Sequence, residues 1–151
     1  MANIATIRPI VILLVEDNPG DVDLAREALD TGKLHNTLEV VRDGVEAMDF
    51  LRKKGKFSDA PRPDLIILDL NLPKKDGRQV LAEIKEDENL KRIPVVILTT
   101  SSAEEDVLQT YNLHANCYIT KPIDIQQFLH VVRTIEEFWL SIVVLPDTEN
   151  R

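Results

Sequence analysis

The feature that most constrains the fold of this chain is an alternation between short apolar runs and stretches with helical periodicity. The five runs are four to six residues long and contain β-branched residues, which suits β-strands. They occupy residues 10–15 (IVILLV), 38–41 (LEVV), 65–69 (LIILD), 95–99 (VVILT) and 117–120 (CYIT). The first, third and fourth runs barely alternate between apolar and polar residues, as in strands covered on both faces. The second contains Glu39 and is expected at an edge of the sheet.

Between the runs, apolar residues recur every three or four positions, which indicates amphipathic helices. These stripes are Val22, Ala25 and Leu29; Val45, Met48 and Leu51; Val80, Leu81 and Ile84; Val107, Leu108 and Tyr111; and Ile125, Phe128, Leu129 and Val132. Asp76 is expected to open the third helix, and Ser102 with Glu105 has the pattern of a capping box at the fourth. The alternation predicts an α/β fold, a doubly wound five-stranded parallel sheet of the (βα)5, flavodoxin-like type.

The composition is that of one globular domain without a membrane span. The 151 residues are 44% hydrophobic, and no apolar run approaches the roughly 18 residues that a span requires. A formal net charge of −8 disfavours binding to nucleic acid or anionic lipid. Cys117 is the single cysteine and no signal-peptide pattern is seen, so we expect a cytoplasmic protein. We expect an N-terminal arm at 1–9, one domain at 10–140, and a C-terminal extension and tail at 141–151.

Charged and hydroxyl side chains follow four of the five expected strands at the point where each strand ends. They are the pair Glu16 and Asp17, then Asp69, Thr99 and Lys121. The carboxyl ends of parallel strands meet at one edge of a sheet, where ligands of such folds bind. Three carboxylates that converge there repel one another unless a cation lies among them. Mg2+ prefers oxygen ligands, so the pattern predicts a Mg2+ site suited to phosphoryl transfer.

In this hypothesis Asp69 is the nucleophile. A carboxylate with an ordinary pKa of about 4 is ionised at neutral pH and needs no general base. Thr99 and Lys121 are expected to hold phosphoryl oxygens and to stabilise the charge of a loose transition state.

The metal ligands predicted by the same hypothesis are oxygen atoms around Asp69. Asp17 is expected to bind Mg2+ directly, and Glu16 is expected to bind it through water or to help position it. The backbone carbonyl of Asn71, two residues beyond Asp69, is expected to supply a further oxygen.

Four short motifs add a resemblance to a known family. They are E-D at 16–17, L-D-L-N-L-P at 68–73, L-T-T at 98–100 and Y-I-T-K-P at 118–122. In this order and spacing they resemble the signature of response-regulator receiver domains, over roughly residues 10–138. The resemblance implies a CheY-like fold that a histidine kinase phosphorylates on Asp69 with Mg2+ as cofactor, and no activity on an external substrate.

The same resemblance implies two conformational features. One is a cis peptide bond between Lys121 and Pro122. The other is a switch formed by Thr99 and the aromatic ring of Tyr118, for which simple packing of the ring at the sheet edge is the alternative. The sequence departs from the common pattern at Glu16, where Asp is more usual, and this longer side chain puts the geometry of the metal site in doubt.

Three further segments are similar to stand-alone regulators that are paired with cyanobacterial and other bacterial phytochrome kinases. They are FSDAPRPDL at 57–65, LPKKDGR at 72–78 and IEEFWL at 135–140. This similarity implies a sensor histidine kinase of the phytochrome type as the partner.

Other functions are compatible with parts of the pattern. A phosphatase of the haloacid dehalogenase type also forms an aspartyl phosphate, but it needs a second Asp where this chain has Asn71. A flavodoxin-like carrier would bind a cofactor phosphate after the first strand, where Glu16 and Asp17 would repel it. A further alternative is an interaction module that is never phosphorylated, and only an experiment can distinguish it from a phosphoacceptor.

The C-terminal region carries more apolar residues than one helix face can bury. Ile125, Phe128, Leu129, Val132 and Trp139 form one stripe, and Val131, Ile135, Phe138 and Ile142 form another. An exposed apolar patch of this kind usually marks an interface. We therefore predict a homodimer, or docking onto the kinase, with Phe138, Trp139 and Ile142 at the interface. The alternative is that this extension of the last helix folds back on its own domain.

Overall fold

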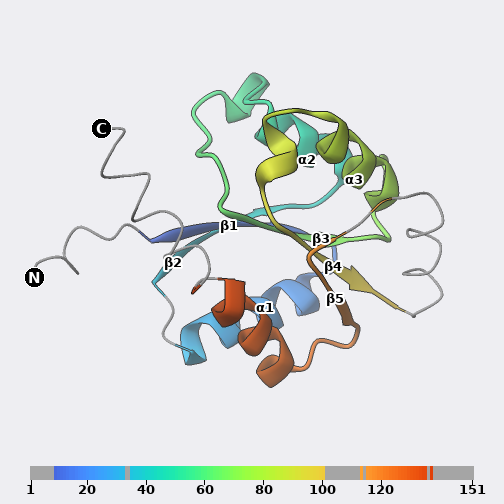
Figure 1. The fold of residues 1–151 in the computed structure, drawn as a ribbon. Helices are drawn as coiled ribbons and strands as arrows, with labels where there is room; N and C mark the ends of the chain where they lie inside the picture. The colour runs from blue at the N-terminus through green and yellow to red at the C-terminus, as the bar shows by residue number, and fades with distance from the viewer. Residues whose placement is uncertain (1–8, 33–34, 101–112, 114, 136, 138–151) are drawn as a thin grey trace, which may run out of the picture.

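One parallel sheet forms the centre of the protein (Figure 1). The computed structural model describes residues 9–32, 35–100, 113, 115–135 and 137. The strands are β1 (Ile10–Val15), β2 (Asn36–Val41), β3 (Leu65–Asp69), β4 (Val95–Thr99) and β5 (Cys117–Thr120). Their order is β2-β1-β3-β4-β5, so β2 lies at an edge and β1, β3 and β4 lie inside the sheet, as the sequence predicted.

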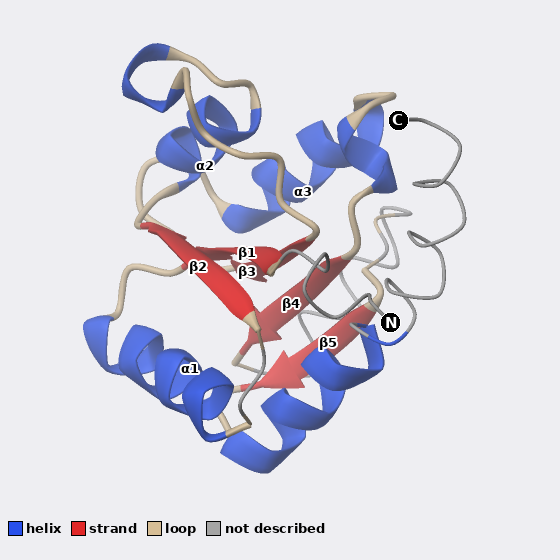
Figure 2. Cartoon of the chain, turned by 90° about the vertical axis from the view of Figure 1, so that its left-hand side faces the viewer, coloured by secondary structure: helices blue, strands red, loops and turns tan. Residues whose placement is uncertain are grey.

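Helices cover both faces of the sheet (Figures 1 and 2). α1 (Pro19–Thr31) and the helix of residues 125–135 lie on one face. α2 (Gly44–Leu51) and α3 (Gly77–Glu86) lie on the other, with short turns η2 (Gly55–Phe57) and η3 (Leu90–Arg92). The predicted doubly wound α/β fold is confirmed. Within the described part of the chain, no helix has the length and apolar character to cross a membrane.

The fourth predicted helix lies outside the described residues. This concerns its stripe, Val107, Leu108 and Tyr111, and its predicted capping residues, Ser102 and Glu105.

The sheet separates two apolar cores, because successive residues of a strand point to opposite faces. Leu13 and Ile66 face the core under α2 and α3, whereas Ile12 and Ile67 face the core under α1 and the last helix. All four side chains are fully buried. Burial on both faces explains why the inner strands appear in the sequence as continuous apolar runs.

Three helices begin at polar side chains that come shortly after strand ends. The side chain of Asn18 caps α1, that of Asp43 caps α2 and that of Asp76 caps α3, each by accepting a hydrogen bond from a backbone N–H of the first turn. Asp76 is the residue predicted to open its helix. These caps fix where each chain segment leaves the carboxyl edge of the sheet.

The prediction that Val45 belongs to the buried stripe of α2 is wrong, because its side chain is 43% exposed. α2 begins at Gly44, and its buried residues include Ala47 and Phe50. These lie roughly 160° and 140° around the helix from Val45 at about 100° per residue. Phe50 packs against Phe57 of the turn η2, with ring centroids 5.4 Å apart. Phe50 therefore faces the protein, and Val45 on the opposite side of α2 faces solvent.

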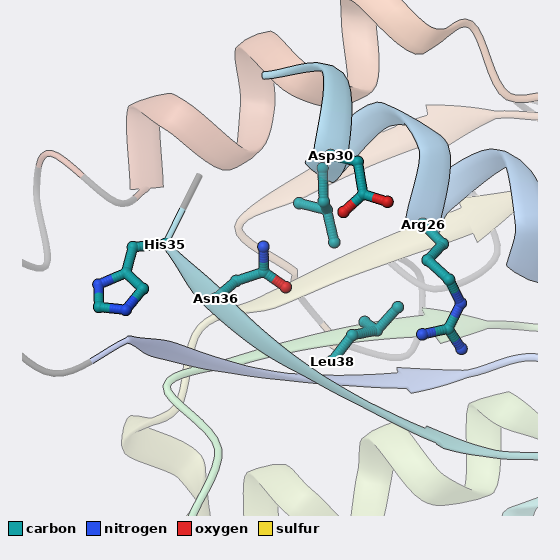
Figure 3. A pocket seen from close by; sticks show the side chains of 6 residues that line it. Arg26, Asp30, His35, Asn36 and Leu38 are labelled. Atoms are coloured by element: carbon teal, nitrogen blue, oxygen red, sulfur yellow. The ribbon is translucent and has the colours of Figure 1, made fainter. Parts of the chain in front are cut away.

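A hollow of about 380 Å³ lies between α1 and β2 (Figure 3). Arg26 and Asp30 line it from the C-terminal half of α1, and His35 and Asn36 line it from the start of β2. The hollow therefore lies toward the amino ends of the strands, away from the edge at which the predicted acidic residues stand.

Candidate functional site

The sheet register brings the predicted polar residues together. Val15 pairs with Leu68, which places Glu16 beside Asp69 at the ends of β1 and β3. β3 pairs with β4, which ends at Thr99, and Thr99 pairs with Thr120 of β5. Lys121 follows directly. The four strand ends thus present Glu16, Asp69, Thr99 and Lys121 along one edge.

Lys121 is the cation at the centre of this edge. Its Nζ lies 2.9 Å from Glu16 Oε1, 2.9 Å from Asp69 Oδ2 and 3.1 Å from Asp21 Oδ2. It donates a hydrogen bond to Asp69 Oδ2. One ammonium group therefore faces three carboxylates, which leaves an excess of negative charge at the site.

Asp21 is a member of the site that sequence reasoning missed. It lies in the first turn of α1, and its backbone N–H donates to Asn18 Oδ1 at 3.1 Å. An acidic side chain in a first turn has an ordinary explanation, because it interacts favourably with the helix dipole. The usable signal was its place in the chain: α1 begins at the strand end that carries Glu16, so its first turn has to lie beside the same edge.

Glu16, Asp17 and Asp69 form a cluster of three carboxylates. One oxygen from each lies within 4.8 Å of the others. Glu16 and Asp69 are buried, whereas Asp17 is exposed. Such a group of oxygen donors suits a hard divalent cation.

The two oxygens of Glu16 differ in their surroundings. Oε2 accepts a hydrogen bond from the backbone N–H of Asn18 at 3.1 Å. Oε1 is buried and at ion-pair distance from Lys121, but it has no hydrogen bond of good geometry within the described part of the chain. A buried carboxylate oxygen that faces one ammonium group without a well-aligned hydrogen bond, and that lies beside two further carboxylates, fits a bound metal ion.

Burial and the charges of the cluster shift the pKa values of Glu16 and Lys121. Burial raises the pKa of Glu16 to about 7, with the Asp69 charge acting in the same direction and Lys121 acting against it. Burial acts to lower the pKa of Lys121, but its close contacts with Asp69, Glu16 and Asp21 together outweigh burial and raise that pKa. Lys121 thus stays charged near neutral pH, whereas a proton on Glu16 competes with any bound cation.

The loop after β3 fixes the orientation of Asp69. The backbone N–H of Asn71 donates to Asp69 Oδ1 at 3.0 Å, while Oδ2 faces Lys121. The predicted role of the Asn71 carbonyl as a metal ligand stays a prediction. Thr99 is buried at the end of β4. The peptide bond between Lys121 and Pro122 is cis, as the resemblance implied.

The remaining predicted residues are placed only in part. Tyr118 is half-buried in β5 and packs against the core under α2 and α3, and its role as a switch stays a prediction. Val131 and Ile135 pack half-buried against the core under the last helix, so this part of the second apolar stripe is covered by the domain itself. The predicted interface residues Phe138, Trp139 and Ile142 lie outside the described residues.

Comparison with known proteins agrees with this geometry. Residues 12–133 match the response regulator receiver domain. The response regulator Rcp1 of Synechocystis sp. is 54% identical over 138 residues, which cover 91% of this chain and 94% of Rcp1.

Two solved structures are similar in both sequence and fold. The phosphorylated cyanobacterial phytochrome response regulator RcpA is 56% identical, with 89% of this chain and 96% of RcpA covered and a TM-score of 0.74. The Mn2+-bound form of Rcp1 is 55% identical, with 87% of this chain and 95% of that chain covered and a TM-score of 0.74. The chain therefore belongs to the response regulator receiver domain family.

Proposed function

We propose that this protein is a single-domain response regulator that accepts a phosphoryl group on Asp69. The observation that carries the proposal is the contact between Asp69 Oδ2 and Lys121 Nζ, 2.9 Å apart, inside a cluster of three carboxylates. A buried carboxylate held by one hydrogen-bonded ammonium and one backbone N–H is oriented for attack. The domain is proposed to span residues 10–140, between an arm at 1–9 and an extension and tail at 141–151.

The proposed metal site consists of the carboxylates of Glu16, Asp17 and Asp69 with the backbone carbonyl of Asn71. The buried Oε1 of Glu16, which has no well-aligned hydrogen bond within the described residues, supports it, and so does the Mn2+ found with the related Rcp1. We propose Mg2+ as the physiological ion, because all four donors are oxygen atoms, which suit a hard divalent cation. When bound, the ion neutralises charge on the phosphoryl oxygens.

The chemical step follows from the position of Asp69. One of its carboxylate oxygens forms a bond to phosphorus while the bond from phosphorus to the donor's imidazole nitrogen breaks, so that an acyl phosphate forms and the imidazole leaves. Lys121 is proposed to turn from Asp69 Oδ2 to a phosphoryl oxygen, and the hydroxyl of Thr99 to hold a second one. Movement of Thr99 toward the phosphoryl group, coupled to Tyr118, is the proposed switch.

Chemical phosphoryl donors test this proposal without a kinase. Incubation with acetyl phosphate or phosphoramidate and Mg2+ should add one phosphoryl group, measured by intact mass. Removal of Mg2+ with a chelator should prevent the addition, because the carboxylates would then repel the incoming phosphate. A chain that gains the same mass with the chelator present would contradict the role of the metal.

The proposed partner is a sensor histidine kinase of the phytochrome type. Its support is similarity to RcpA, a cyanobacterial phytochrome response regulator. Phosphotransfer from a panel of histidine kinases would identify it, with rapid transfer from a phytochrome kinase as the expected result. We further propose a cytoplasmic location, no direct binding of nucleic acid and no turnover of an external substrate.

We also propose that the protein forms a homodimer through its last helix and the C-terminal extension, with Phe138, Trp139 and Ile142 in the interface. The proposal rests on the apolar sequence of that extension. Sedimentation should show a dimer at high micromolar concentration, and Phe138→Asp should shift it toward monomer because a charge would be buried in an apolar contact. A wild-type monomer, with and without a phosphoryl mimic, would refute the dimer.

A further inference from the structure

The loop of residues 70–76 joins Asp69 to α3 and is closed tightly at its base. The backbone N–H of Gly77 donates to the carbonyl oxygen of Leu70 at 3.2 Å. A Cβ atom on Gly77 would lie 2.4 Å from the carbonyl oxygen of Asp69, a distance that real Cβ atoms do not reach. The start of α3 is therefore in close contact with the backbone of the proposed phosphoacceptor, and only glycine fits at position 77.

The start of α2 contacts the same loop from its other side. A Cβ atom on Gly44 would lie 2.0 Å from the carbonyl oxygen of Lys75 and 2.6 Å from its Cβ. The neighbouring Asp43 caps α2, and its Oδ2 lies 3.6 Å from Lys74 Nζ. The turn of Asp43 and Gly44 thus contacts two consecutive residues of the loop, Lys74 through an ion pair and Lys75 through its backbone.

A chain of ion pairs holds Lys75 at its other end. Its ammonium group contacts Glu83 of α3, and Glu83 also forms an ion pair with Arg52, which follows α2, at 3.2 Å. Lys75 and Glu83 are each more than two-thirds shielded from solvent in their side chains. Lys75 is therefore fixed twice, through its backbone by Gly44 and through its side chain by Glu83.

The backbone of the loop also has a conformation that its contacts must maintain. Lys74 has a φ of +64°, in the left-handed region that residues other than glycine rarely adopt. Such conformations persist when surrounding contacts over-determine them, and they concentrate near functional sites. The loop is thus held in one shape from three sides.

We propose that Glu83, acting through Lys75, is a positioning residue that sets the affinity of the acidic cluster for a divalent cation. The loop carries Asn71, whose N–H fixes Asp69 Oδ1 and whose carbonyl is the proposed fourth ligand. Loss of the Lys75–Glu83–Arg52 chain removes one of the three restraints on the loop, so the metal donors are held less firmly in their preset arrangement. This inference rests on the proposed function and deepens it, by adding control from residues that touch neither metal nor phosphate.

The effect is expected in metal binding rather than in fold stability. Lys75 and Glu83 hold a loop rather than an element of the core, so their replacement is expected to change metal affinity more than the free energy of folding. Partners that orient metal ligands typically change affinity by about tenfold or more when they are replaced.

Glu83→Gln is the test, because it keeps the size of the side chain and removes the charge that binds Lys75 and Arg52. Calorimetric titration with Mg2+ should give a Kd about tenfold above wild type, with the urea midpoint nearly unchanged. Glu88→Gln is the matched control, since it removes the pair with Lys91, 2.9 Å apart, in the segment that follows α3. It should leave the Kd as in wild type.

Lys75→Met should reproduce the change in Kd, and combining it with Glu83→Gln should add little, because both break the same contact. A Glu83→Gln protein with the Kd of wild type would overturn the inference, and so would an equal change in Glu88→Gln. If wild type binds Mg2+ and is phosphorylated while Glu83→Gln behaves identically, only this inference fails. If wild type binds no Mg2+, the proposed function fails with it.

Discussion

Replacement of Asp69 with Asn should abolish phosphoryl labelling by acetyl phosphate, by phosphoramidate and by a histidine kinase. The amide has nearly the same shape as the carboxylate, so it can still accept the N–H of Asn71, but its oxygen is a poor nucleophile. After incubation with donor and Mg2+, the intact mass of wild type should increase by one phosphoryl group, and the mass of the variant should not change.

Asp59→Asn is the matched control, because Asp59 is exposed in the segment between α2 and β3, away from the strand ends. It should be labelled as fast as wild type. Circular dichroism should confirm that both variants are folded. An Asp69→Asn protein that still gains one phosphoryl group would mean that another residue is the acceptor.

Asp17→Asn should weaken Mg2+ binding by at least about 30-fold while leaving the fold as stable as before, or more so. A unit charge 4 Å from a divalent ion contributes about 2 kcal/mol even at the dielectric constant of water, which corresponds to this factor. Asp17 is exposed and shares a 4.8 Å cluster with two other carboxylates. Removing its charge therefore relieves repulsion in the metal-free protein.

Two measurements check this prediction. Calorimetric titration with Mg2+ gives the affinity, and urea denaturation in the presence of a chelator gives the free energy of unfolding. Asp23→Asn removes an exposed charge from α1 outside the cluster and should change neither the affinity nor the free energy of unfolding. A clear fall in the urea midpoint of Asp17→Asn would mean that Asp17 stabilises the fold rather than binding metal.

The sheet could be predicted because its physical causes are local in the sequence. Strands covered on both faces must be apolar at successive positions, and Ile12 and Leu13 show this directly, since they are buried in different cores. The order of the polar strand ends then places Glu16, Asp69 and Lys121 at one edge without any knowledge of side-chain geometry.

The features that were missed depend on contacts between elements. Val45 fits the helical period of its segment, but the packing of Phe50 on Phe57 turns it toward solvent. Asp21 resembles any acidic residue of a first turn until the helix is placed beside Lys121. The exposure of Val45 and the contact of Asp21 with Lys121 cannot be predicted from the local sequence pattern, because both depend on how the helices pack.

The same limit applies to the loop after β3. Gly44, which contacts this loop, belongs to a different turn and lies 31 positions before Lys75. Only the folded chain shows that the two meet closely enough to exclude a Cβ atom. The sequence thus indicates which residues carry the chemistry, and the structure indicates which residues hold them in position.

The central claim, that Asp69 accepts the phosphoryl group, is tested most directly by locating the modified residue. Reduction of an aspartyl phosphate with borohydride converts the acyl phosphate to an alcohol, so the labelled aspartate becomes homoserine and can be found by peptide mass spectrometry. After treatment with phosphoramidate and Mg2+, homoserine should appear at position 69 and nowhere else. Homoserine at position 17 or 21, or a labelled protein with intact Asp69, would contradict the account.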